Sequence, residues 1–577
     1  MNHEVDASPG WITRFEASGC QESPRYDETM AYFRRLADYT GLAEMISFGR
    51  SPQGRELMCL VVAGGREFTP EKAKSSGKAV LLIQNGIHAG EIEGKDACML
   101  LLREMLVTRT KEELLGHLIL LIIPILNVDG HERISPFNRL NQLGPREMGW
   151  RTTSQNLNLN RDYMKADTPE MQALLNLYSQ WLPDLSLDNH TTNGADYQYH
   201  ITYGIERHEH MDPGLSAWAT GKFMPYVVSR VEEDGFLTAP YVELKGRELN
   251  EGIVAQPALP RFSNGYAALQ NRVCVLVETH SLKPFENRVY SAKAFIAAVL
   301  EYVNAHHQVV KELNRSADEE TIRRFQGEKT PLPLEFAATH DFELRRFKGF
   351  EILEEESSIT GVNIVRYTNR GTEFDVPLYN TSTVKEHVGV PHAYLIPREF
   401  DDIIARIRLH GIAVGSTTLA IALHVERYKL TDVRFASRSY EGRQRVECDV
   451  ETFGEEVTVP QGTAIVFTQQ RTLRVIVNLL EPKGPDSYLR WGFFNAFLER
   501  KEYAEPSIME PIARQMMERD HRLKQEFLDL LAKDAEFNDD PDARLDFFYQ
   551  RSVYFDKGEN VYPIMRVVEQ DQWEKLL

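Results

Sequence analysis

The chain has 577 residues, of which 42% are hydrophobic and 26% charged, and its formal net charge is −19. Because one hydrophobic core stops growing near roughly 250–300 residues, we expect two or three domains. The acidic balance argues against a nucleic-acid-binding protein, since such a protein needs a basic surface to displace counterions from phosphates.

Between about Tyr26 and His306, short apolar runs alternate with longer amphipathic ones. The expected strands are residues 56–63, 78–84, 118–126, 184–189 and 272–279. The expected helices are residues 27–39, 92–107, 169–181, 213–233 and 291–312. This alternation is typical of an α/β domain in which helices cover the faces of a sheet.

The pattern changes after this segment. The stretch from Lys311 to Gly327 is dense in charge and poor in large apolar residues, so we expect a domain boundary there. Residues 351–380 and 454–482 then alternate apolar and polar side chains between Gly, Pro and Asn, as half-buried antiparallel strands do. One helix is expected at residues 398–410.

The end of the chain has a helical pattern from about Trp491 onward, which is clearest at residues 511–533. The predicted organisation is therefore an α/β domain over residues 1–315, a β-rich accessory domain over residues 325–490 and a mainly helical region over residues 491–577.

Two segments bear on the environment of the protein. The apolar run LILLIIPIL at residues 118–126 is about half of the roughly 20 residues that cross a bilayer, so it predicts a buried strand and no membrane span. The first residues, MNHEVDASPGWITRF, contain neither the basic nor the apolar segment of a secretory signal. We therefore expect a cytoplasmic protein, secreted or periplasmic only if a leader was removed, and the sequence leaves its oligomeric state open.

A candidate metal pair lies in the segment NGIHAGEIEG, which directly follows an expected strand and precedes an expected helix. Its His88 and Glu91 have a spacing that lets an imidazole and a carboxylate converge on one ion. A helix-capping glutamate beside a hydrogen-bonded histidine explains this pair alone equally well. A second His-x-x-Glu pair, His340 and Glu343, lies in the β-rich part without such a setting, and we interpret it as accidental.

A third candidate ligand favours the metal interpretation. His190, in the segment DLSLDNHTTNG, follows another expected strand, and Asp188 is a candidate acceptor for a ligand imidazole. Two histidines and one carboxylate, with a fourth position left for water, form the ligand set of catalytic zinc in hydrolytic enzymes. The sequence thus predicts one Zn²⁺ per chain, although such a set also accepts cobalt or manganese.

Further motifs accompany these ligands in a fixed order. They are SFGRSPQGREL (47–57), PILNVDG (124–130), GWRTT, NLNRDY (158–163) and VLVETHS. Together with the ligand segments they resemble the M14 family of zinc carboxypeptidases across about residues 25–305. The resemblance implies a mixed, twisted sheet between layers of helices, followed here by the β-rich domain and the helical region.

The resemblance also implies roles for individual residues. Glu278 in VLVETHS matches the family's general base, and Arg151 in GWRTT resembles its oxyanion-stabilising arginine, with Arg139 and Arg146 as nearby alternatives. Asn160 and Arg161 match the pair that binds the terminal carboxylate of the substrate, for which a guanidinium offers a bidentate fork.

Three family features are less well matched in this chain. Asp162 stands where the family usually has asparagine, which puts the charge of the carboxylate subsite in question. The mobile tyrosine of the family has two candidate counterparts, Tyr266 and Tyr241. The residue at the base of its side-chain pocket is expected near Ser263.

The resulting hypothesis is a metallocarboxypeptidase that acts on a peptide or acyl-amino-acid substrate with a free carboxylate. One alternative keeps the zinc chemistry but makes the protein an amidase or deacylase that acts on a cell-wall peptide or an N-acyl amino acid. Another is a catalytically silent binding module. The accessory domain is expected either to select substrates or to stabilise the catalytic domain.

Overall fold

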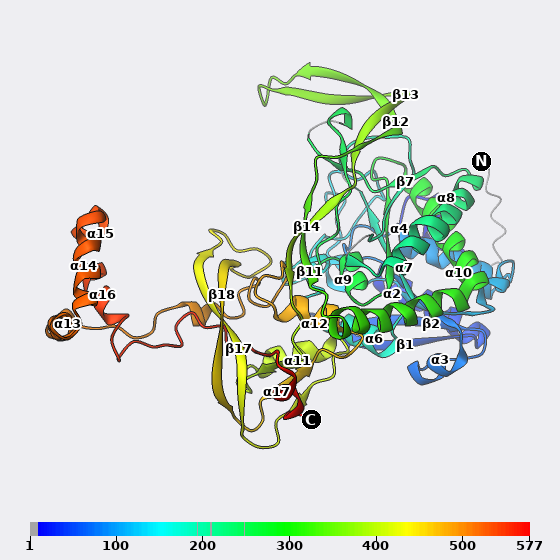
Figure 1. Ribbon diagram of the computed structural model, residues 1–577. Helices are drawn as coiled ribbons and strands as arrows, with labels where there is room; N and C mark the ends of the chain where they lie inside the picture. The colour runs from blue at the N-terminus through cyan, green and yellow to red at the C-terminus, as the bar shows by residue number, and fades with distance from the viewer. Residues whose placement is uncertain (1–9, 193, 208–209, 247–248) are drawn as a thin grey trace.

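The computed structural model describes residues 10–192, 194–207, 210–246 and 249–577 (Figure 1). The first nine residues, which are part of the N-terminus predicted to lack a secretory signal, lie outside this set. In the described part of the chain, no helix combines the length and apolar character needed to cross a membrane.

An eight-stranded mixed sheet is the centre of the first domain, which we define as residues 10–327. Its strand order is β1-β2-β4-β3-β5-β10-β6-β7, and the neighbouring strands β4, β3, β5 and β10 are parallel. The strands are β1 (Ala43–Arg50), β2 (Glu56–Ala63), β3 (Ala79–Gln84), β4 (Leu118–Ile123), β5 (Leu185–Thr191), β6 (Ile201–Gly204), β7 (Thr238–Pro240) and β10 (Val273–Thr279). All five expected strands are present. The strand expected at residues 118–126 ends at Ile123, because Pro124 has no N–H for the ladder.

Side chains alternate between the two faces of this sheet, and each face has its own core. Leu81 and Ile83 of β3 pack with one group of helices, and Val80 and Leu82 pack with another. The first group is α2 (Tyr26–Thr40), α4 (Glu93–Leu106), α7 (Pro213–Trp218), α8 (Met224–Glu233) and α10 (Phe285–Ile322), and the second is α6 (Pro169–Trp181) and α9 (Ser263–Leu269). The predicted layering of a sheet between helices is confirmed.

The helix expected at residues 213–233 is present but interrupted. The π-helical turn Ala219–Phe223 separates α7 from α8. Pro225 at the start of α8 explains this turn, because its ring removes one backbone donor and clashes with the carbonyl four residues earlier.

The predicted boundary stretch from Lys311 to Gly327 is helical, because α10 continues through it to Ile322. Its charged residues pair along the exposed side, where Arg315 binds Glu312 and Glu319. The opposite side of the helix faces the core, and its buried residues recur at helical spacing, namely Asn314, Ala317 and Thr321. The predicted boundary stretch is therefore the last helical part of the first domain.

The accessory region, residues 328–577, contributes to three smaller sheets. The pair β11 (Leu332–Ala338) and β14 (Ser382–Val388) forms one. The hairpin β12 (Glu343–Glu356) and β13 (Asn363–Tyr379) extends outward and joins β8 (Glu243–Leu244) and β9 (Ile253–Val254) of the first domain (Figure 1). The third has six strands in the order β16-β19-β15-β20-β17-β18, which are β16 (Gly415–Ser416), β19 (Ala464–Phe467), β15 (Ala393–Ile396), β20 (Met565–Val567), β17 (Ile421–Phe435) and β18 (Val446–Val459).

Part of the β prediction at residues 454–482 was wrong. After β19 the chain forms helix α12 (Leu473–Leu480), in which every residue is buried. A short helix that is buried on all sides and mostly apolar cannot be told from a buried strand by periodicity. The helix expected at residues 398–410 is present as α11 (Asp401–Leu409).

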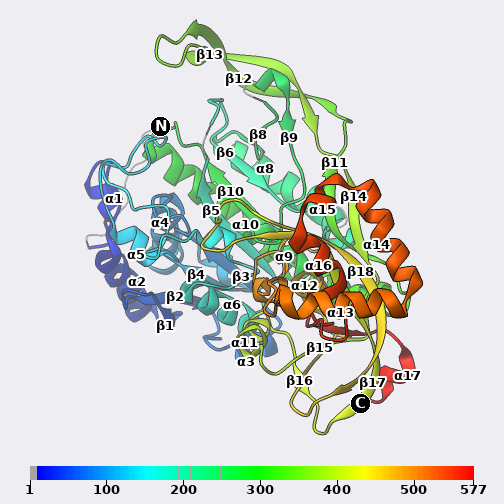
Figure 2. The same ribbon diagram turned by 90° about the vertical axis from the view of Figure 1, so that its left-hand side faces the viewer.

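The C-terminal region contains helices that project from the rest of the molecule (Figures 1 and 2). These are α13 (Pro506–Arg519), α14 (His521–Lys533), α15 (Ala535–Asp539) and α16 (Pro541–Tyr549). The single helix expected at residues 511–533 is two helices, because Asp520 leaves the helical conformation and its carboxylate accepts hydrogen bonds from two backbone N–H groups of α14. The chain then returns as β20 between β15 and β17.

Candidate active site

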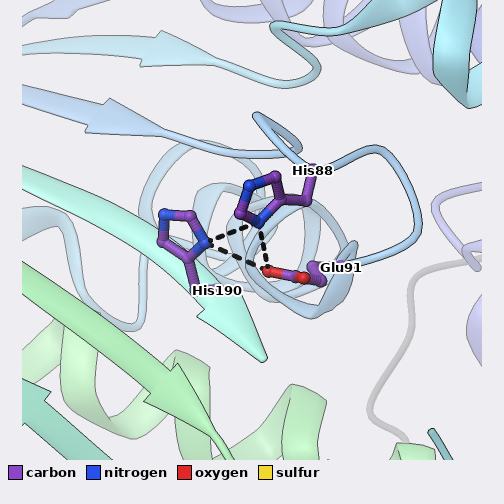
Figure 3. A group of neighbouring side chains, drawn as sticks. All are labelled: His88, Glu91 and His190. Carbon is purple, nitrogen blue, oxygen red and sulfur yellow. Dashed lines mark hydrogen bonds and ion pairs between the residues drawn. The ribbon is translucent and has the colours of Figure 1, made fainter. Parts of the chain in front are cut away.

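The candidate metal ligands come from two neighbouring parallel strands. His88 and Glu91 lie in the loop between β3 and α4, and His190 lies near the end of β5. Because β3 and β5 pair in parallel, with Gln84 opposite Asp188, their carboxyl ends meet at one edge of the sheet. Figure 3 shows the three side chains pointing toward one another from these segments.

The three ligand atoms form a small triangle. Oε2 of Glu91 lies 3.1 Å from Nδ1 of His88 and 3.0 Å from Nδ1 of His190, and the two Nδ1 atoms are 3.2 Å apart. All three side chains are buried, and no other group of this kind occurs among the described residues. Ligand atoms about 2.0–2.2 Å from a tetrahedral zinc lie roughly 3.3–3.6 Å apart, so the triangle accommodates an ion after a small outward shift of its atoms.

The Nε2 atoms of His88 and His190, which face away from the triangle, also support a metal site. Nε2 of His190 lies 2.8 Å from Oδ2 of Asp188, and Nε2 of His88 lies 3.1 Å from Oδ1 of Asn158. That Asn158 oxygen also accepts from the backbone N–H of Asn160, which fixes the orientation of the amide. Acceptors at Nε2 hold a proton on that nitrogen of both imidazoles, which makes their Nδ1 atoms the nitrogens available to a metal. Two Nδ1 atoms and a carboxylate oxygen that converge on one point fit a divalent metal.

Glu278 lies beside the ligands because β10 pairs with β5 in parallel, with Glu278 opposite His190. Burial raises the pKa of the Glu278 carboxyl to about 8. His190 and Arg151 oppose this rise, whereas the negative charges of Glu91 and Asp188 add to it. The side chain is thus a proton acceptor of unusually high affinity for a carboxylate.

These groups open into one cavity of about 850 Å³. Its wall includes all three candidate ligands and Glu278. The bases of β12 and β13 supply another part of the wall through Glu343, Arg345 and Leu378. The cavity is therefore bounded by both the first domain and the accessory region.

The three candidate oxyanion arginines occupy different places. Arg151 lines the cavity, and its Nη1 lies 3.3 Å from Oε1 of Glu91. Arg139 binds the same carboxylate oxygen but is not part of the cavity wall. Arg146 binds Glu22 on the surface. Among the three, Arg151 is therefore placed best to reach a substrate.

Asn160 and Arg161 both line the cavity, from the 3₁₀ turn Leu159–Arg161. The oxygen Oδ1 of Asn160 accepts from the backbone N–H of Ser263. Asp162, whose charge the sequence put in question, faces away from the cavity and is fully buried. It binds Lys165 and accepts from the backbone N–H and the hydroxyl of Thr168. Its negative charge is therefore neutralised outside the carboxylate subsite.

The structure distinguishes the two candidate tyrosines. Tyr266 is buried in the core, where its hydroxyl contacts Nδ1 of His410 and accepts from Gln270, so it cannot be the mobile residue. Tyr241 lines the cavity, and the negative charge of Glu278, followed by burial, raises the pKa of its phenol. Tyr241 is therefore the candidate that can meet a substrate.

The base of the side-chain pocket, which the sequence places near Ser263, stays a prediction. Ser263 is buried at the first position of α9 and does not line the main cavity, whereas its neighbours Phe262 and Asn264 do. Sequence reasoning also missed Glu206. This carboxylate lines the cavity and accepts from the side-chain amide of Asn264 and the backbone N–H of Ala258. No motif identifies it, because only the fold brings it to the cavity.

Known proteins resemble most of this chain. Residues 29–210 match the family model Peptidase_M14, described as zinc carboxypeptidase. Carboxypeptidase 2 of Trichophyton rubrum is 23% identical over 509 residues, which cover 84% of this chain and 87% of that protein. Carboxypeptidase 2 of Trichophyton tonsurans is 23% identical over 508 residues with the same coverage. A metallo-carboxypeptidase structure from Burkholderia cenocepacia aligns with a TM-score of 0.37 and 17% identity, over 49% of this chain and 69% of that one. Residues 29–210 are thus similar to the M14 family of zinc carboxypeptidases, and most of the chain is similar to proteins named carboxypeptidase 2.

Proposed function

We propose that the protein is a zinc metallocarboxypeptidase that removes the C-terminal residue of a peptide. The observation that carries this proposal is the convergence of His88, Glu91 and His190 in a cavity that also exposes Glu278 and Arg161. One cavity thus holds a metal site, a candidate base and a cation for a terminal carboxylate.

Each of these residues has a chemical task in the proposed reaction. A bound zinc ion supplies Lewis-acid polarisation of the scissile carbonyl and of water. Glu278 accepts a proton from the attacking water and delivers it to the leaving nitrogen, and its raised pKa suits both transfers. Arg151 on the cavity wall donates to the oxygen that becomes negative in the transition state.

Arg161 and Asn160 make the proposed enzyme an exopeptidase. A guanidinium binds a carboxylate through two parallel hydrogen bonds, which gives both charge and direction. With the terminal carboxylate held at Arg161, the last peptide bond of the substrate is the one presented to Glu278 and the metal site. An amide in place of the carboxylate loses the charge-assisted pair.

The first test measures metal content by mass spectrometry. We expect about one zinc per chain in the native protein and none in a His88→Ala/Glu91→Ala variant. The matched control is His340→Ala/Glu343→Ala, which removes the same residue types at the same spacing from a pair outside any ligand cluster of the described residues. Loss of zinc in the control, or its retention in the first variant, would contradict the assignment.

The second test compares substrates. Peptides with free and with amidated C-termini are offered alongside N-acyl amino acids, and released products are identified by mass. We expect the free peptides to lose one terminal residue and the amidated ones to remain intact. Hydrolysis confined to the N-acyl amino acids would favour the deacylase alternative, and binding without hydrolysis would favour a silent module.

A further inference from the structure

A tight turn of the accessory region contacts Arg161 of the cavity wall from outside the first domain. It lies in the connection between β17 and β18, where Tyr440 and Arg443 exchange two backbone hydrogen bonds of 2.9 and 3.1 Å. The two residues between them, Glu441 and Gly442, have φ of 51° and 75°. These values are typical of a type I′ turn, which favours Asn, Asp or Gly at its first central position. Glu441 occupies this position although glutamate is not among the favoured residues, which suggests that its side chain makes a specific contact.

The turn is docked firmly onto the NLNRDY segment and the residues that follow it. A carboxylate oxygen of Glu441 accepts from the backbone N–H of Asn158 at 2.8 Å. Arg443 binds Asp167 through two hydrogen bonds of 2.6 Å each. These contacts join positions that are nearly 300 residues apart in the sequence.

Tyr440 makes the contact that matters for the cavity. Its hydroxyl oxygen accepts from Nε of Arg161 at 3.0 Å, and its ring stacks on Trp491 with an interplanar angle of 10°. The guanidinium of Arg161 is further held by a hydrogen bond from Nη1 to the carbonyl of Asn160 at 2.7 Å and by the ring of Phe262. Its orientation is therefore fixed on three sides.

The guanidinium keeps donors for a ligand, because Nη1 uses only one of its two N–H groups on the carbonyl of Asn160. Within the described part of the chain, Nη2 of Arg161 has no hydrogen-bond partner, while the side chain forms part of the cavity wall. A guanidinium that is already oriented loses less conformational freedom when it binds a carboxylate. The hydroxyl of Tyr440 thus prepares Arg161 for binding.

We propose that the turn Tyr440–Arg443 completes the carboxylate subsite, with Tyr440 as a positioning residue for Arg161. This inference rests on the proposed function and deepens it, because it gives the accessory region a direct part in substrate binding. The tyrosine acts through Arg161 and need not touch the reacting atoms.

The test is the Tyr440→Phe variant of the full chain, which removes the hydroxyl and keeps the stacking ring. We expect KM for peptides with a free C-terminus to rise about 3- to 10-fold, because one constraint on the arginine is lost. The kcat, the zinc content and the melting temperature should stay unchanged. The matched control is Tyr503→Phe, which changes an exposed tyrosine near the projecting helices. An unchanged KM in Tyr440→Phe, or an equal change in the control, would overturn the proposal.

A double-mutant cycle separates positioning from general support. The Arg161→Lys variant keeps the charge but lacks Nε and the planar fork. In that background Tyr440→Phe should have no further effect on KM, since the pair acts as a unit. Independent, additive effects would show that Tyr440 does not act through Arg161.

A binding measurement keeps this inference distinct from the proposed catalytic function. In a Glu278→Gln background, calorimetry with one peptide in free and amidated forms reports affinity without turnover. We expect Tyr440→Phe to weaken the free form about 3- to 10-fold and to leave the amidated form unchanged. If the native chain hydrolyses no peptide and this binding pattern is still observed, the catalytic proposal fails and the positioning role stands. If the native chain hydrolyses peptides and the pattern is missing, only the positioning role fails.

Discussion

Glu278 combines burial with closeness to four titratable side chains, and this combination sets its chemistry. Replacing it with glutamine keeps the size and polarity of the side chain but removes the proton acceptor. We expect Glu278→Gln to lower kcat by about 10²- to 10⁴-fold, the typical contribution of a general base. Zinc content, measured on the same sample, should be unchanged. Activity close to that of the native protein would rule out Glu278 as the base.

The raised pKa of Glu278 also predicts a pH profile. The carboxylate must be deprotonated to act as a base, so kcat/KM should fall as the pH drops through its pKa. Burial together with the neighbouring charges places this pKa at about 8, and a bound cation opposes the rise by stabilising the carboxylate. We therefore expect the midpoint of the acid limb between the ordinary value of 4.5 and about 8. The residual activity of Glu278→Gln should lack this limb, and a limb that persists there belongs to another group.

Asp188 orients a candidate metal ligand without joining the ligand triangle. Its Oδ2 accepts from Nε2 of His190, and its Oδ1 accepts from Gln84. Substitution of such a partner typically lowers metal affinity by about 10- to 100-fold, because the imidazole loses its fixed orientation and some basicity. We expect this loss in Asp188→Asn, measured by competition with a zinc chelator. Asp402→Asn, on the exposed side of α11, serves as the control and should bind zinc like the native protein.

At the scale of elements, the sequence predicted most of the first domain and the ligand segments. Strongly apolar strands such as β3 and β4 lie inside the sheet, where local pattern and tertiary environment agree. Edge strand β1 was missed, because a strand at a sheet edge needs only part of its residues to be apolar. Helix α12 was misread because it is buried on every side. The contact between Tyr440 and Arg161 could not be predicted, since no local pattern encodes a pairing over such a separation.

The continuation of α10 through the predicted boundary stretch gives a test at this scale. Ala317 is fully buried on the inner side of the helix, whereas its neighbour Ser316 is exposed. Ala317→Asp places an unpaired charge in the core, so we expect it to lower the free energy of unfolding by more than about 3 kcal/mol. Ser316→Asp should change it by less than about 0.5 kcal/mol. Chemical denaturation of both variants measures the difference, and two neutral substitutions would indicate a solvated linker.

At the scale of the whole molecule, the first domain and the accessory region share a hydrophobic core. Leu174 of α6 and Tyr266 of α9 belong to the same buried cluster as Ile407 of α11 and Val475 of α12. Polar contacts cross the same interface, including the contact between Tyr266 and His410. The second face of the central sheet is therefore covered partly by the accessory region. This arrangement favours a stabilising role for that region in addition to its contribution to the cavity wall.

The projecting helices α13–α16 have the opposite character. Their apolar side chains, among them Met509 and Phe548, pack in a small core of their own. The two chain segments that connect these helices to the rest meet where the backbone N–H of Asn560 donates to the carbonyl of Phe497. The helices can therefore be removed in one piece without separating β20 from its sheet.

Two deletions test this division of the molecule. A chain ending at Arg315 cuts α10 and removes the cover of one sheet face, so we expect an insoluble or unfolded fragment without a zinc site. Replacing residues 501–557 with a short Gly/Ser linker should instead leave zinc content unchanged and kcat/KM within about twofold, since surface segments joined at close ends tolerate such changes. Circular dichroism, zinc analysis and peptide hydrolysis measure both proteins. A soluble, zinc-loaded and active fragment ending at Arg315 would show that the first domain folds without cover from the accessory region. The preference of that fragment for peptides with free over amidated C-termini would then measure the effect of losing Tyr440.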